Sequence, residues 1–459
     1  MLVSFSVSNF RSFNEEQTFS LVASKRHSGE HEAHTRPIPG SEEEVLRTAV
    51  LYGANGAGKS NLFKALQFLK KIALRSRQKA DLLEREPFLL RSEDRESSFD
   101  LQFIASGTLY RYCLKVDDFR IIEESLVWVT KGKEKVIYER STSPEGKVEV
   151  RLNDTRTGDT VDHTKIEALA TVGGPQNQSF LATVFVTLDV ADWPAHLSSA
   201  MFWFAAQLRL IDPEGADPGF RGTFATDPEL LRFAGDFLSA ASTGIDHLAA
   251  TESQISEEDA TRLLSPRVRQ HLATATERTP VRQLLGNGDV VVATKSGEDL
   301  RYTLIQVKAA HRNTDGDVVP FDIKQESDGT QRLLQLIPAL HSMNQQPRCY
   351  FIDEIDRSLH PILVHDFLGF FLRSCEGKDA QLIMTTHESS LLDQDLLRRD
   401  EIWFAEKNRE GATSLYSLLE FNPRNDMQLR KNYLQGRFGA VPFLGAIDGL
   451  FEKKEISPR

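Results

Sequence analysis

One eight-residue stretch constrains the fold of this chain more than any other. Gly53 to Ser60 reads Gly-Ala-Asn-Gly-Ala-Gly-Lys-Ser and matches the pattern G-x-x-x-x-G-K-[ST]. The apolar run from Ala49 to Tyr52 predicts a strand before it, and apolar residues at helical spacing predict a helix after it. That helical stripe is Leu62, Leu66, Leu69 and Ala73. A strand, a glycine-rich turn and a helix N-terminus together predict a phosphate-binding loop.

The residue types of this loop suit a nucleoside triphosphate. Glycines let backbone N–H groups turn toward phosphate oxygens, while Lys59 can reach the β and γ oxygens and Ser60 can hold Mg²⁺. We therefore expect a bound nucleotide with Mg²⁺. The predicted nucleotide-binding residues of the loop are Gly53, Asn55, Gly56, Gly58, Lys59, Ser60 and Asn61.

Length and composition predict a globular chain. Its 459 residues are 40% apolar, enough for a large core divided into two or three lobes. No run reaches the roughly 18 apolar residues of a membrane span, and the N-terminus lacks the pattern of a signal peptide. Three scattered cysteines argue against a disulfide framework or a zinc ribbon. These observations predict a cytoplasmic location and no membrane contact.

The net charge of −11 argues against a surface that binds polyanions everywhere. One basic run after the loop offers a local patch for DNA or a protein partner, although such runs are more often solvated faces. Its residues are Lys70, Lys71, Arg75, Arg77, Lys79 and Arg85. A DNA contact therefore stays open at this stage.

Patterning divides the chain into three parts. Alternation from Val3 to Val7 and four strand-like runs between Phe99 and Tyr138 predict an antiparallel β lobe. From about 166 to 285 the pattern is helical and predicts an inserted helical lobe, and strand-like runs resume at Val290. The predicted domains are 1–165, an N-terminal lobe with the phosphate loop and a β meander, 166–288, the helical insert, and 289–459, a C-terminal lobe.

Two predicted strands in the C-terminal lobe end in reactive residues. Cys349 to Ile352 leads into Asp353 and Glu354, which is how phosphate-loop enzymes place one carboxylate near Mg²⁺ and another at the attacking water. Gln381 to Thr386 leads into His387, which can hydrogen-bond a γ-phosphate. This histidine opens an H-E-x-x-H zinc pattern whose second histidine is missing, so the zinc interpretation fails.

A second phosphate-binding element is predicted upstream of these strands. Ser327 and Gly329 precede a helical stripe that begins at Leu333, so they lie at a helix N-terminus. Such a terminus presents N–H groups and a positive dipole to an anion. Two phosphate-binding elements in one chain suggest a nucleotide clamped from both sides.

These motifs together resemble the ABC-type ATPases of the SMC, Rad50 and RecF group. Gly53 to Ser60 matches their Walker A loop, and Asp353 with Glu354 matches Walker B. Ser327 to Thr330 is similar to the signature motif, and His387 matches the switch histidine. The resemblance follows the order of the motifs over nearly the whole chain.

Further segments extend the resemblance and also depart from it. Asp356 resembles the aspartate of the D-loop, and Asn9 to Phe13 resembles the opening of RecF and SMC heads, where an arginine, here Arg11, approaches the phosphates. The signature has Asp328 where ABC proteins usually carry glycine. The Q-loop has no firm position, and its candidates are Gln176 and Gln178.

The resemblance implies an α/β fold, an ABC/SMC-type P-loop NTPase head with an N-terminal antiparallel β lobe and an inserted helical lobe. It also implies ATP hydrolysis in a homodimer or higher oligomer, in which the signature of one chain completes the ATP site of the other. Mg²⁺ would bind Ser60 and Asp353. The implied catalytic residues are Glu354, which activates water, and Lys59 and His387 at the γ-phosphate.

Three segments resemble one subgroup more closely, the short AAA-type ATPases of bacterial anti-phage systems such as RloA and the first protein of AbiL. These segments are Met1 to Ala23, Ile355 to Pro361 and Asn432 to Ala440. The related overcoming-lysogenisation-defect nucleases continue into a Toprim domain, for which the segment after His387 is too short. We therefore expect a sensor or regulatory subunit that controls a separately encoded effector, a Toprim- or HNH-type nuclease.

Other functions remain open from the sequence. A RecF-like clamp that binds DNA in repair would use the same ATPase motifs. A scaffold that binds ATP without hydrolysing it is disfavoured by the intact pair Asp353 and Glu354. An ABC transporter subunit is the least favoured alternative, because of the segment Asn9 to Phe13 and the large insert.

Overall fold

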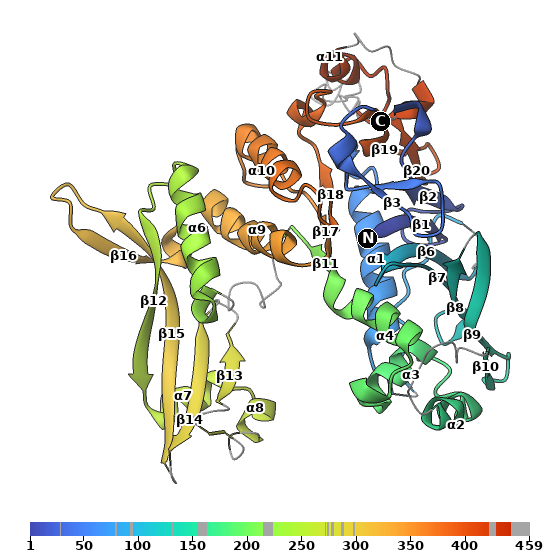
Figure 1. The fold of residues 1–459 in the computed structure, drawn as a ribbon, viewed down its shortest axis with the longest axis horizontal. Helices are drawn as coiled ribbons and strands as arrows, with labels where there is room; N and C mark the ends of the chain where they lie inside the picture. The colour runs from blue at the N-terminus through green and yellow to red at the C-terminus, as the bar shows by residue number, and fades with distance from the viewer. Residues whose placement is uncertain are drawn as a thin grey trace, which may run out of the picture. The chain divides into compact units, whose positions relative to one another are not determined.

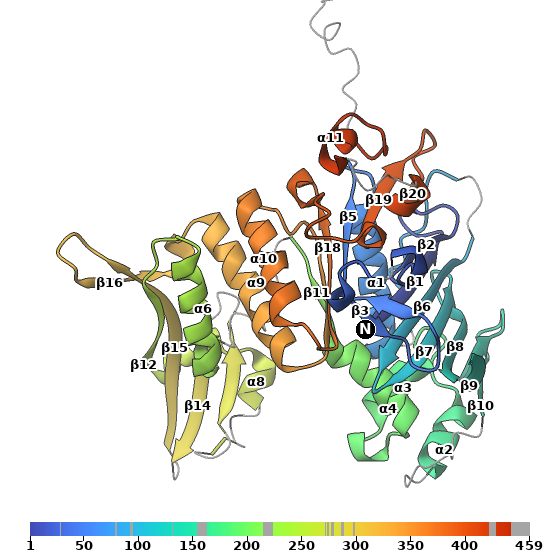
Figure 2. The ribbon, with the colours of Figure 1, turned by 45° about the horizontal axis from the view of Figure 1, so that its top comes forward.

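The computed structural model describes the chain in two compact units. We call Leu2–Ala205 with Thr385–Arg459 the P-loop unit, and Ala206–Met384 with Met1 the Walker B unit. Figures 1 and 2 show the elements of both units in two views. The described residues are 1–27, 29–78, 80–91, 95–130, 132–153, 163–213, 224–270, 272, 275–276, 280–285, 289–296, 299–421 and 428–441.

A seven-stranded antiparallel sheet forms one side of the P-loop unit, in the order β10-β9-β8-β7-β6-β1-β2. Its strands are β1 (Leu2–Ser8), β2 (Gln17–Ser20), β6 (Ser97–Ala105), β7 (Thr108–Val116), β8 (Ile121–Thr130), β9 (Lys133–Thr142) and β10 (Val148–Leu152). Burial alternates strictly along β6, as expected of a sheet with one face on the core. The predicted N-terminal β lobe and its meander are confirmed.

A second group of strands carries the phosphate loop. The fully buried β5 (Thr48–Tyr52) pairs in parallel with β19 (Ile402–Lys407), which pairs antiparallel with β20 (Thr413–Ser417). The short strands β3 (Thr35–Pro37) and β4 (Glu44–Leu46) form a hairpin. After β5 the chain turns through the loop into α1 (Lys59–Leu74), so the predicted strand and helix around the loop are confirmed.

The remaining elements of the P-loop unit are helical. The α-helices are α2 (Thr164–Val172), α3 (Phe180–Thr187), α4 (Ala195–Phe202) and α11 (Leu429–Leu434). The short helices are η1 (Lys25–His27), η2 (Glu32–His34), η3 (Val190–Asp192), η7 (Ser389–Leu391), η8 (Arg399–Glu401) and η9 (Leu418–Phe421). α3 packs against α1, and the Ser179 side chain caps its N-terminus by accepting from the N–H of Ala182.

A buried carboxylate joins this sheet to α3. Glu124 on β8 accepts hydrogen bonds from the hydroxyls of Tyr138 (2.6 Å) and Tyr112 (3.1 Å) and from the N–H of Phe180 (2.7 Å). Arg140 is equally buried, and its Nε lies 3.8 Å from the carboxylate. Burial beside Glu124 raises the pKa of both tyrosines. The carboxylate therefore stabilises the sheet and the helix N-terminus at once.

In the part of the Walker B unit that the structure describes, three strands run in parallel and three helices are long. β17 (Arg348–Ile352) lies between β11 (Leu208–Ile211) and β18 (Ala380–Thr386). The helices are α6 (Pro228–Ala240), α9 (Asp328–Gln345) and α10 (Pro361–Ser374). The rings of Phe233 and Phe237 on α6 contact the ring of Phe370 on α10, with ring centroids 6.3 and 6.2 Å apart.

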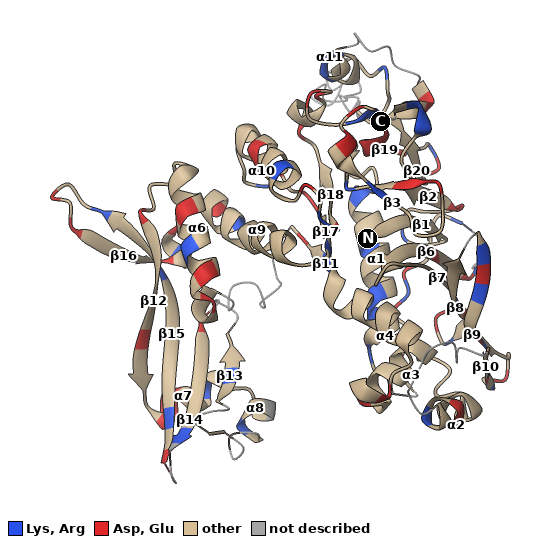
Figure 3. Ribbon diagram, in the orientation of Figure 1, with Lys and Arg blue, Asp and Glu red and all other residues tan. Residues whose placement is uncertain are grey.

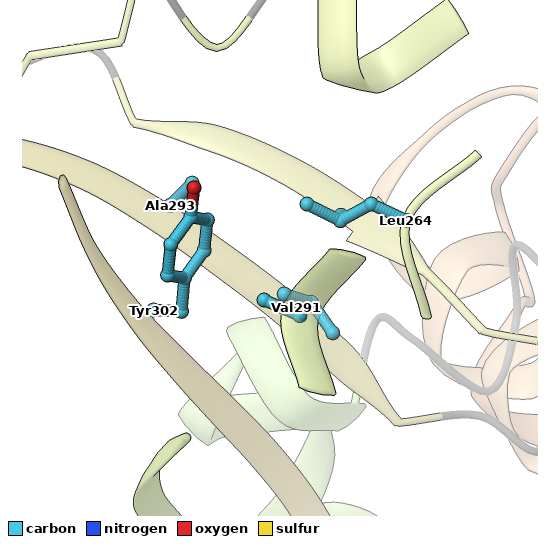
Figure 4. Packing of buried hydrophobic residues seen from close by; sticks show 5 residues of the cluster. Leu264, Val291, Ala293 and Tyr302 are labelled. Carbon is cyan, nitrogen blue, oxygen red and sulfur yellow. The ribbon is translucent and has the colours of Figure 1, made fainter. Parts of the chain in front are cut away.

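A second sheet of the Walker B unit has the order β12-β15-β14-β13, with β16 also on β15. Its strands are β12 (His247–Ile255), β13 (Val281–Leu284), β14 (Val290–Ser296), β15 (Asp299–Arg312) and β16 (Val318–Asp322). The short helices are α7 (Glu257–Leu263), α8 (Pro266–Gln270) and η6 (Ile323–Gln325), and η4 (Trp203–Gln207) spans the sequence boundary between the two units. Figure 4 shows how Leu264, Val291, Ala293 and Tyr302 pack together over β14 and β15. These side chains form the small core of this sheet.

The purely helical pattern predicted between 166 and 285 is wrong in part. α6 is confirmed, but His247–Ile255 is a strand that pairs with β15 along its whole length. Most of its side chains are exposed and polar, so it lacks the alternation that would have revealed it. Within the same predicted helical region, α7 ends at Leu263 and α8 begins at Pro266, because proline cannot continue a helix interior.

Two further predictions concern the domain boundaries and the lack of a membrane span. The domain boundaries at 165 and 288 remain predictions, and the two compact units divide the chain at other positions. None of the helices in the described ranges is long and apolar enough to cross a membrane.

Replacing Glu124 with Ala should destabilise the P-loop unit by about 3–5 kcal/mol, because the change leaves a buried arginine without its counter-charge and two tyrosine hydroxyls without their acceptor. Urea unfolding followed by circular dichroism measures the effect. Glu123→Ala is the matched control, since Glu123 is the exposed neighbour on β8 and should change stability by less than about 0.5 kcal/mol. Equal shifts for the two variants would contradict this account of Glu124.

Candidate functional site

The phosphate loop requires glycine at positions where the chain passes close to other segments. A Cβ on Gly58 would lie 2.1 Å from Thr413 Oγ1, and a Cβ on Gly53 would lie 2.6 Å from the carbonyl oxygen of Ala405. Gly56 has a φ of +77° and no atom within 4 Å of its Cβ position. The loop is therefore held tightly on β19 and β20 while its tip is open, which fits a phosphate cradle.

Lys59 is the cation of this cradle and is 5% exposed. Its Nζ donates to the carbonyls of Gly53 (2.8 Å) and Ala54 (3.3 Å). It also lies 3.0 Å from Nε2 of the exposed His387. An ammonium group can only donate, so the ring nitrogen that it contacts acts as the acceptor. The structure thus brings together Lys59 and His387, which are 328 residues apart in sequence.

The hydroxyls of Thr413 and Ser12, which the sequence analysis did not assign, hold the phosphate loop by hydrogen bonds. Thr413 Oγ1 on β20 donates to the carbonyl of Ala57 at 2.8 Å and lies 2.7 Å from Ser12 Oγ. Ser12 Oγ also accepts from the Asn61 side chain at 2.7 Å. Ser12 lies inside the segment that resembles SMC heads, whereas no local pattern marks Thr413. The predicted nucleotide ligand Asn61 is thereby oriented by the N-terminal segment.

Arg11 has a different partner from the one expected. Its backbone is left-handed, with a φ of 50°, and its guanidinium forms an ion pair with Glu86 at 2.6 Å. Its backbone N–H donates to the carbonyl of the same residue at 2.6 Å. The predicted approach of Arg11 to the nucleotide phosphates therefore stays a prediction.

Two arginines of the basic run are buried in the unit, whereas Arg75 is exposed and Lys70 and Lys71 are half-buried on α1, where Figure 3 shows basic residues. Arg77 is 9% exposed and donates to the carbonyl of Leu82. Arg85 is 8% exposed and pairs with Asp118, and Lys71 pairs with Glu84. Lys79 lies outside the described residues. Arg77 and Arg85 are therefore unavailable to a solvated basic patch, and the DNA contact stays a prediction.

The signature element of the Walker B unit is a capped helix N-terminus. The exposed Ser327 precedes α9, and its Oγ accepts from the N–H of Thr330 at 3.2 Å. A Cβ on Gly329 would lie 2.8 Å from the carbonyl oxygen of Ser358, so the helix start packs on the segment that resembles the D-loop. The structure therefore brings Ser327 and Gly329 close to the turn that contains Asp356.

The Walker B carboxylates follow β17 directly. Asp353 is 1% exposed, and its N–H donates to the carbonyl of Ile211 at 2.9 Å. Glu354 is half-buried and has a left-handed backbone, with a φ of 48°, which is costly for a residue with a side chain. The unusual backbone turns the chain sharply between the two carboxylates.

Arg332 fixes this turn and was missed by the sequence analysis. It is 3% exposed on α9 and donates to the carbonyls of Asp353 (3.1 Å) and Glu354 (3.2 Å). A third bond reaches the carbonyl of Asp212 at 3.0 Å. Burial lowers the pKa of this guanidinium, and the neighbouring Arg357 adds to the effect. One side chain thus connects the signature helix to the Walker B turn.

The two Q-loop candidates, Gln176 and Gln178, form hydrogen bonds inside the P-loop unit. The Gln178 side chain accepts from the N–H of Arg77 at 2.8 Å and donates to Thr183 Oγ1 at 3.0 Å. The carbonyl of Gln176 accepts from the N–H of Ile121 at 2.9 Å. These contacts are structural and do not assign a Q-loop.

Among the described residues, no cluster of histidine, cysteine and carboxylate side chains forms a metal site.

Solved structures similar to this chain include three SMC heads. The Smc head bound to the C-winged helix domain of ScpA is 14% identical, with a TM-score of 0.38 over 91% of this chain and 97% of that chain. The SMC head domain from Thermotoga maritima is 12% identical, with a TM-score of 0.36 over 91% and 98%. The Smc head with an extended coiled coil bound to the C-terminal domain of ScpA, derived from Pyrococcus furiosus, is 13% identical, with a TM-score of 0.34 over 92% and 97%.

No curated protein matches this chain in sequence. A family model described as "AAA domain, putative AbiEii toxin, Type IV TA system" matches residues 49–393, well over half of the chain. This range contains the phosphate loop, the capped α9 N-terminus, the two carboxylates and His387. The chain therefore belongs to this family of AAA domains, which are ATPases of the P-loop class.

Proposed function

We propose that the protein binds and hydrolyses ATP as the regulatory subunit of a bacterial anti-phage defence system, and that it controls a separately encoded effector, a nuclease. The observation that carries the ATPase part is the environment of Lys59. Its Nζ lies 2.8 Å from the carbonyl oxygen of Gly53 and 3.0 Å from the ring of His387, below the open tip at Gly56. This arrangement offers a cation and a hydrogen-bonding ring to a terminal phosphate.

The other proposed roles follow the chemistry of each group. Ser60 and Asp353 are the proposed ligands of Mg²⁺, which supplies charge neutralisation to the phosphates when bound. Glu354 accepts a proton from the attacking water, since its carboxylate follows the fixed turn after β17. Asn55, exposed at the loop tip, and Asn61 at the start of α1 complete the proposed nucleotide contacts.

Dimerisation is part of the proposal because the signature element is an exposed helix start. Ser327 is exposed at the N-terminus of α9, a helix of 18 residues whose dipole favours an anion. In a head-to-tail dimer, Ser327 and Gly329 of one chain would meet the γ-phosphate held by the other. The exposed position of Ser327 supports this arrangement.

The biological role rests on the family and on the resemblance of the terminal segments. The family description names a putative AbiEii toxin of a type IV toxin–antitoxin system. The segments Met1 to Ala23 and Asn432 to Ala440 resemble ATPases of anti-phage systems. We propose that ATP turnover holds or releases the effector when a phage signal arrives.

Lys59→Ala should weaken ATP binding by at least about tenfold, because it removes the charge-assisted contact to the phosphates. Fluorescence titration with a labelled ATP analogue measures the affinity. Lys64→Ala is the matched control, since Lys64 is exposed on the same helix. In cells that carry the whole gene cluster, Lys59→Ala should also abolish protection in a phage plaque assay, whereas Lys64→Ala should retain it. Equal affinity for ATP in both variants would refute the proposed site.

Glu354→Gln should lower turnover about a hundredfold or more while ATP binding persists, because the amide cannot take a proton from water. Phosphate release measures the rate, and light scattering should detect a dimer that persists with ATP. The control is Glu376→Gln, an exposed position of the same unit. Undiminished phosphate release from Glu354→Gln would assign water activation to another residue.

A mixture of two inactive variants tests the composite site. In the proposed dimer, Lys59→Ala inactivates the loop of its own chain, and Ser327→Arg inactivates the site of the other chain. An equal mixture should recover about a quarter of the wild-type activity, because half of the dimers are mixed and each contains one intact site. Each variant alone should be inactive. If the mixture stays inactive although native mass spectrometry detects mixed dimers, the two motifs do not act across an interface.

A further inference from the structure

The C-terminal part of the P-loop unit forms a wall of the pocket at the phosphate loop. We call residues 428–441, which contain α11 and the turn after it, the C-terminal cap. A pocket of about 560 Å³ lies between the cap and the loop. Its lining includes Asn55 of the loop, His387 and Ser389 of the turn after β18, and Tyr433 and Gly436 of the cap. The cap therefore borders the side of the loop where Lys59 contacts His387.

Aromatic packing anchors the cap on the strands that carry the loop. The ring of Tyr433 is 5% exposed and lies 5.8 Å from the rings of Phe404 and Tyr52. Tyr52 is the residue immediately before Gly53. Phe438 stacks on Phe404 at 5.9 Å. This buried cluster gives the cap a firm base from which its polar side chains can act on the pocket.

One polar contact leads from the cap to the turn that follows His387. Arg430 on α11 donates from its Nε to Ser389 Oγ at 3.3 Å, and α11 packs against η7, which starts at Ser389. Within the turn, the N–H of Glu388 donates to Thr386 Oγ1 at 2.9 Å. The N–H of Ser390 donates to the Glu388 carboxylate at 2.8 Å. The histidine thus belongs to a short turn that is held at one end by β18 and at the other by the cap.

We propose that Arg430 is a positioning residue: it holds the turn after His387 so that the imidazole stays beside Lys59 at the γ-phosphate end of the loop. This role rests on the proposed ATPase function and adds to it a part for the cap. Arg430 acts through Ser389 and touches no phosphate. Because the contact is long and exposed, its loss should weaken the position of the turn without unfolding the unit.

The first test is kinetic. Arg430→Ala should lower kcat about fivefold with KM for ATP changed less than about twofold, because the loop and Lys59 remain intact. Arg430→Lys should restore most of the loss, since a lysine can still donate to Ser389. Ser389→Ala should reproduce the loss, and the double variant Arg430→Ala with Ser389→Ala should be no slower than either one. Lys431→Ala is the matched control, because Lys431 is an exposed cation on the same helix.

The second test needs no nucleotide. Hydrogen exchange in the nucleotide-free protein should show peptides over 387–392 exchanging about tenfold faster in Arg430→Ala than in Lys431→Ala, with β5 and β19 unchanged. Equal exchange in the two variants would overturn the positioning role, whether or not the protein uses ATP. If exchange is faster in Arg430→Ala but the wild-type protein does not bind ATP, the contact is retained and the proposed function is refuted. A kcat for Arg430→Ala equal to that of Lys431→Ala, in a protein that hydrolyses ATP, would also overturn the inference.

Discussion

The phosphate loop depends on the hydrogen bonds that the Lys59 ammonium forms inside it. A charge that is only 5% exposed needs close polar partners, and the carbonyls of Gly53 and Ala54 and the His387 ring provide them. The loop can curl this tightly only because glycine stands where a Cβ would overlap β19 or β20. The curled backbone supplies the carbonyls that surround the Lys59 charge, and the hydrogen bonds from Lys59 hold the backbone in that curled shape.

In each unit, one buried polar side chain holds a turn of the candidate site by hydrogen bonds to backbone carbonyls. In the P-loop unit, Thr413 holds the carbonyl of Ala57 and contacts Ser12, which in turn accepts from Asn61. In the Walker B unit, Arg332 holds the carbonyls of the turn after β17. Backbone contacts of this kind fix the loop geometry while the reactive side chains stay available.

The sequence was informative where the physics is local. Period-two alternation identified β1, recurring strand-like runs identified the meander, and the glycine-rich loop between an apolar run and a helical stripe placed α1. The N-terminus of α9 after Ser327 also followed from local pattern, because an apolar stripe begins at Leu333. The structure adds that the Ser327 side chain caps this helix. Elements whose identity depends on their neighbours were not recognised, such as the exposed edge strand β12.

The supporting residues could not be predicted for a related reason. Thr413 contacts Ser12, 401 positions earlier, and an isolated threonine in a strand has no spacing that marks such a contact. The same holds for Arg332, which looks like an ordinary polar position of α9, and for Arg77 and Arg85, whose burial depends on the fold around them. The pairing of Arg11 with Glu86 depends equally on a distant loop.

The left-handed backbone at Glu354 has a consequence for how this protein can change. A residue with a side chain pays about 1 kcal/mol or more to adopt this conformation, whereas glycine adopts it without that cost. If Glu354 activates water as proposed, replacing it with glycine would relieve this backbone cost and abolish turnover. The backbone conformation and the proposed chemistry therefore make opposite demands on one position.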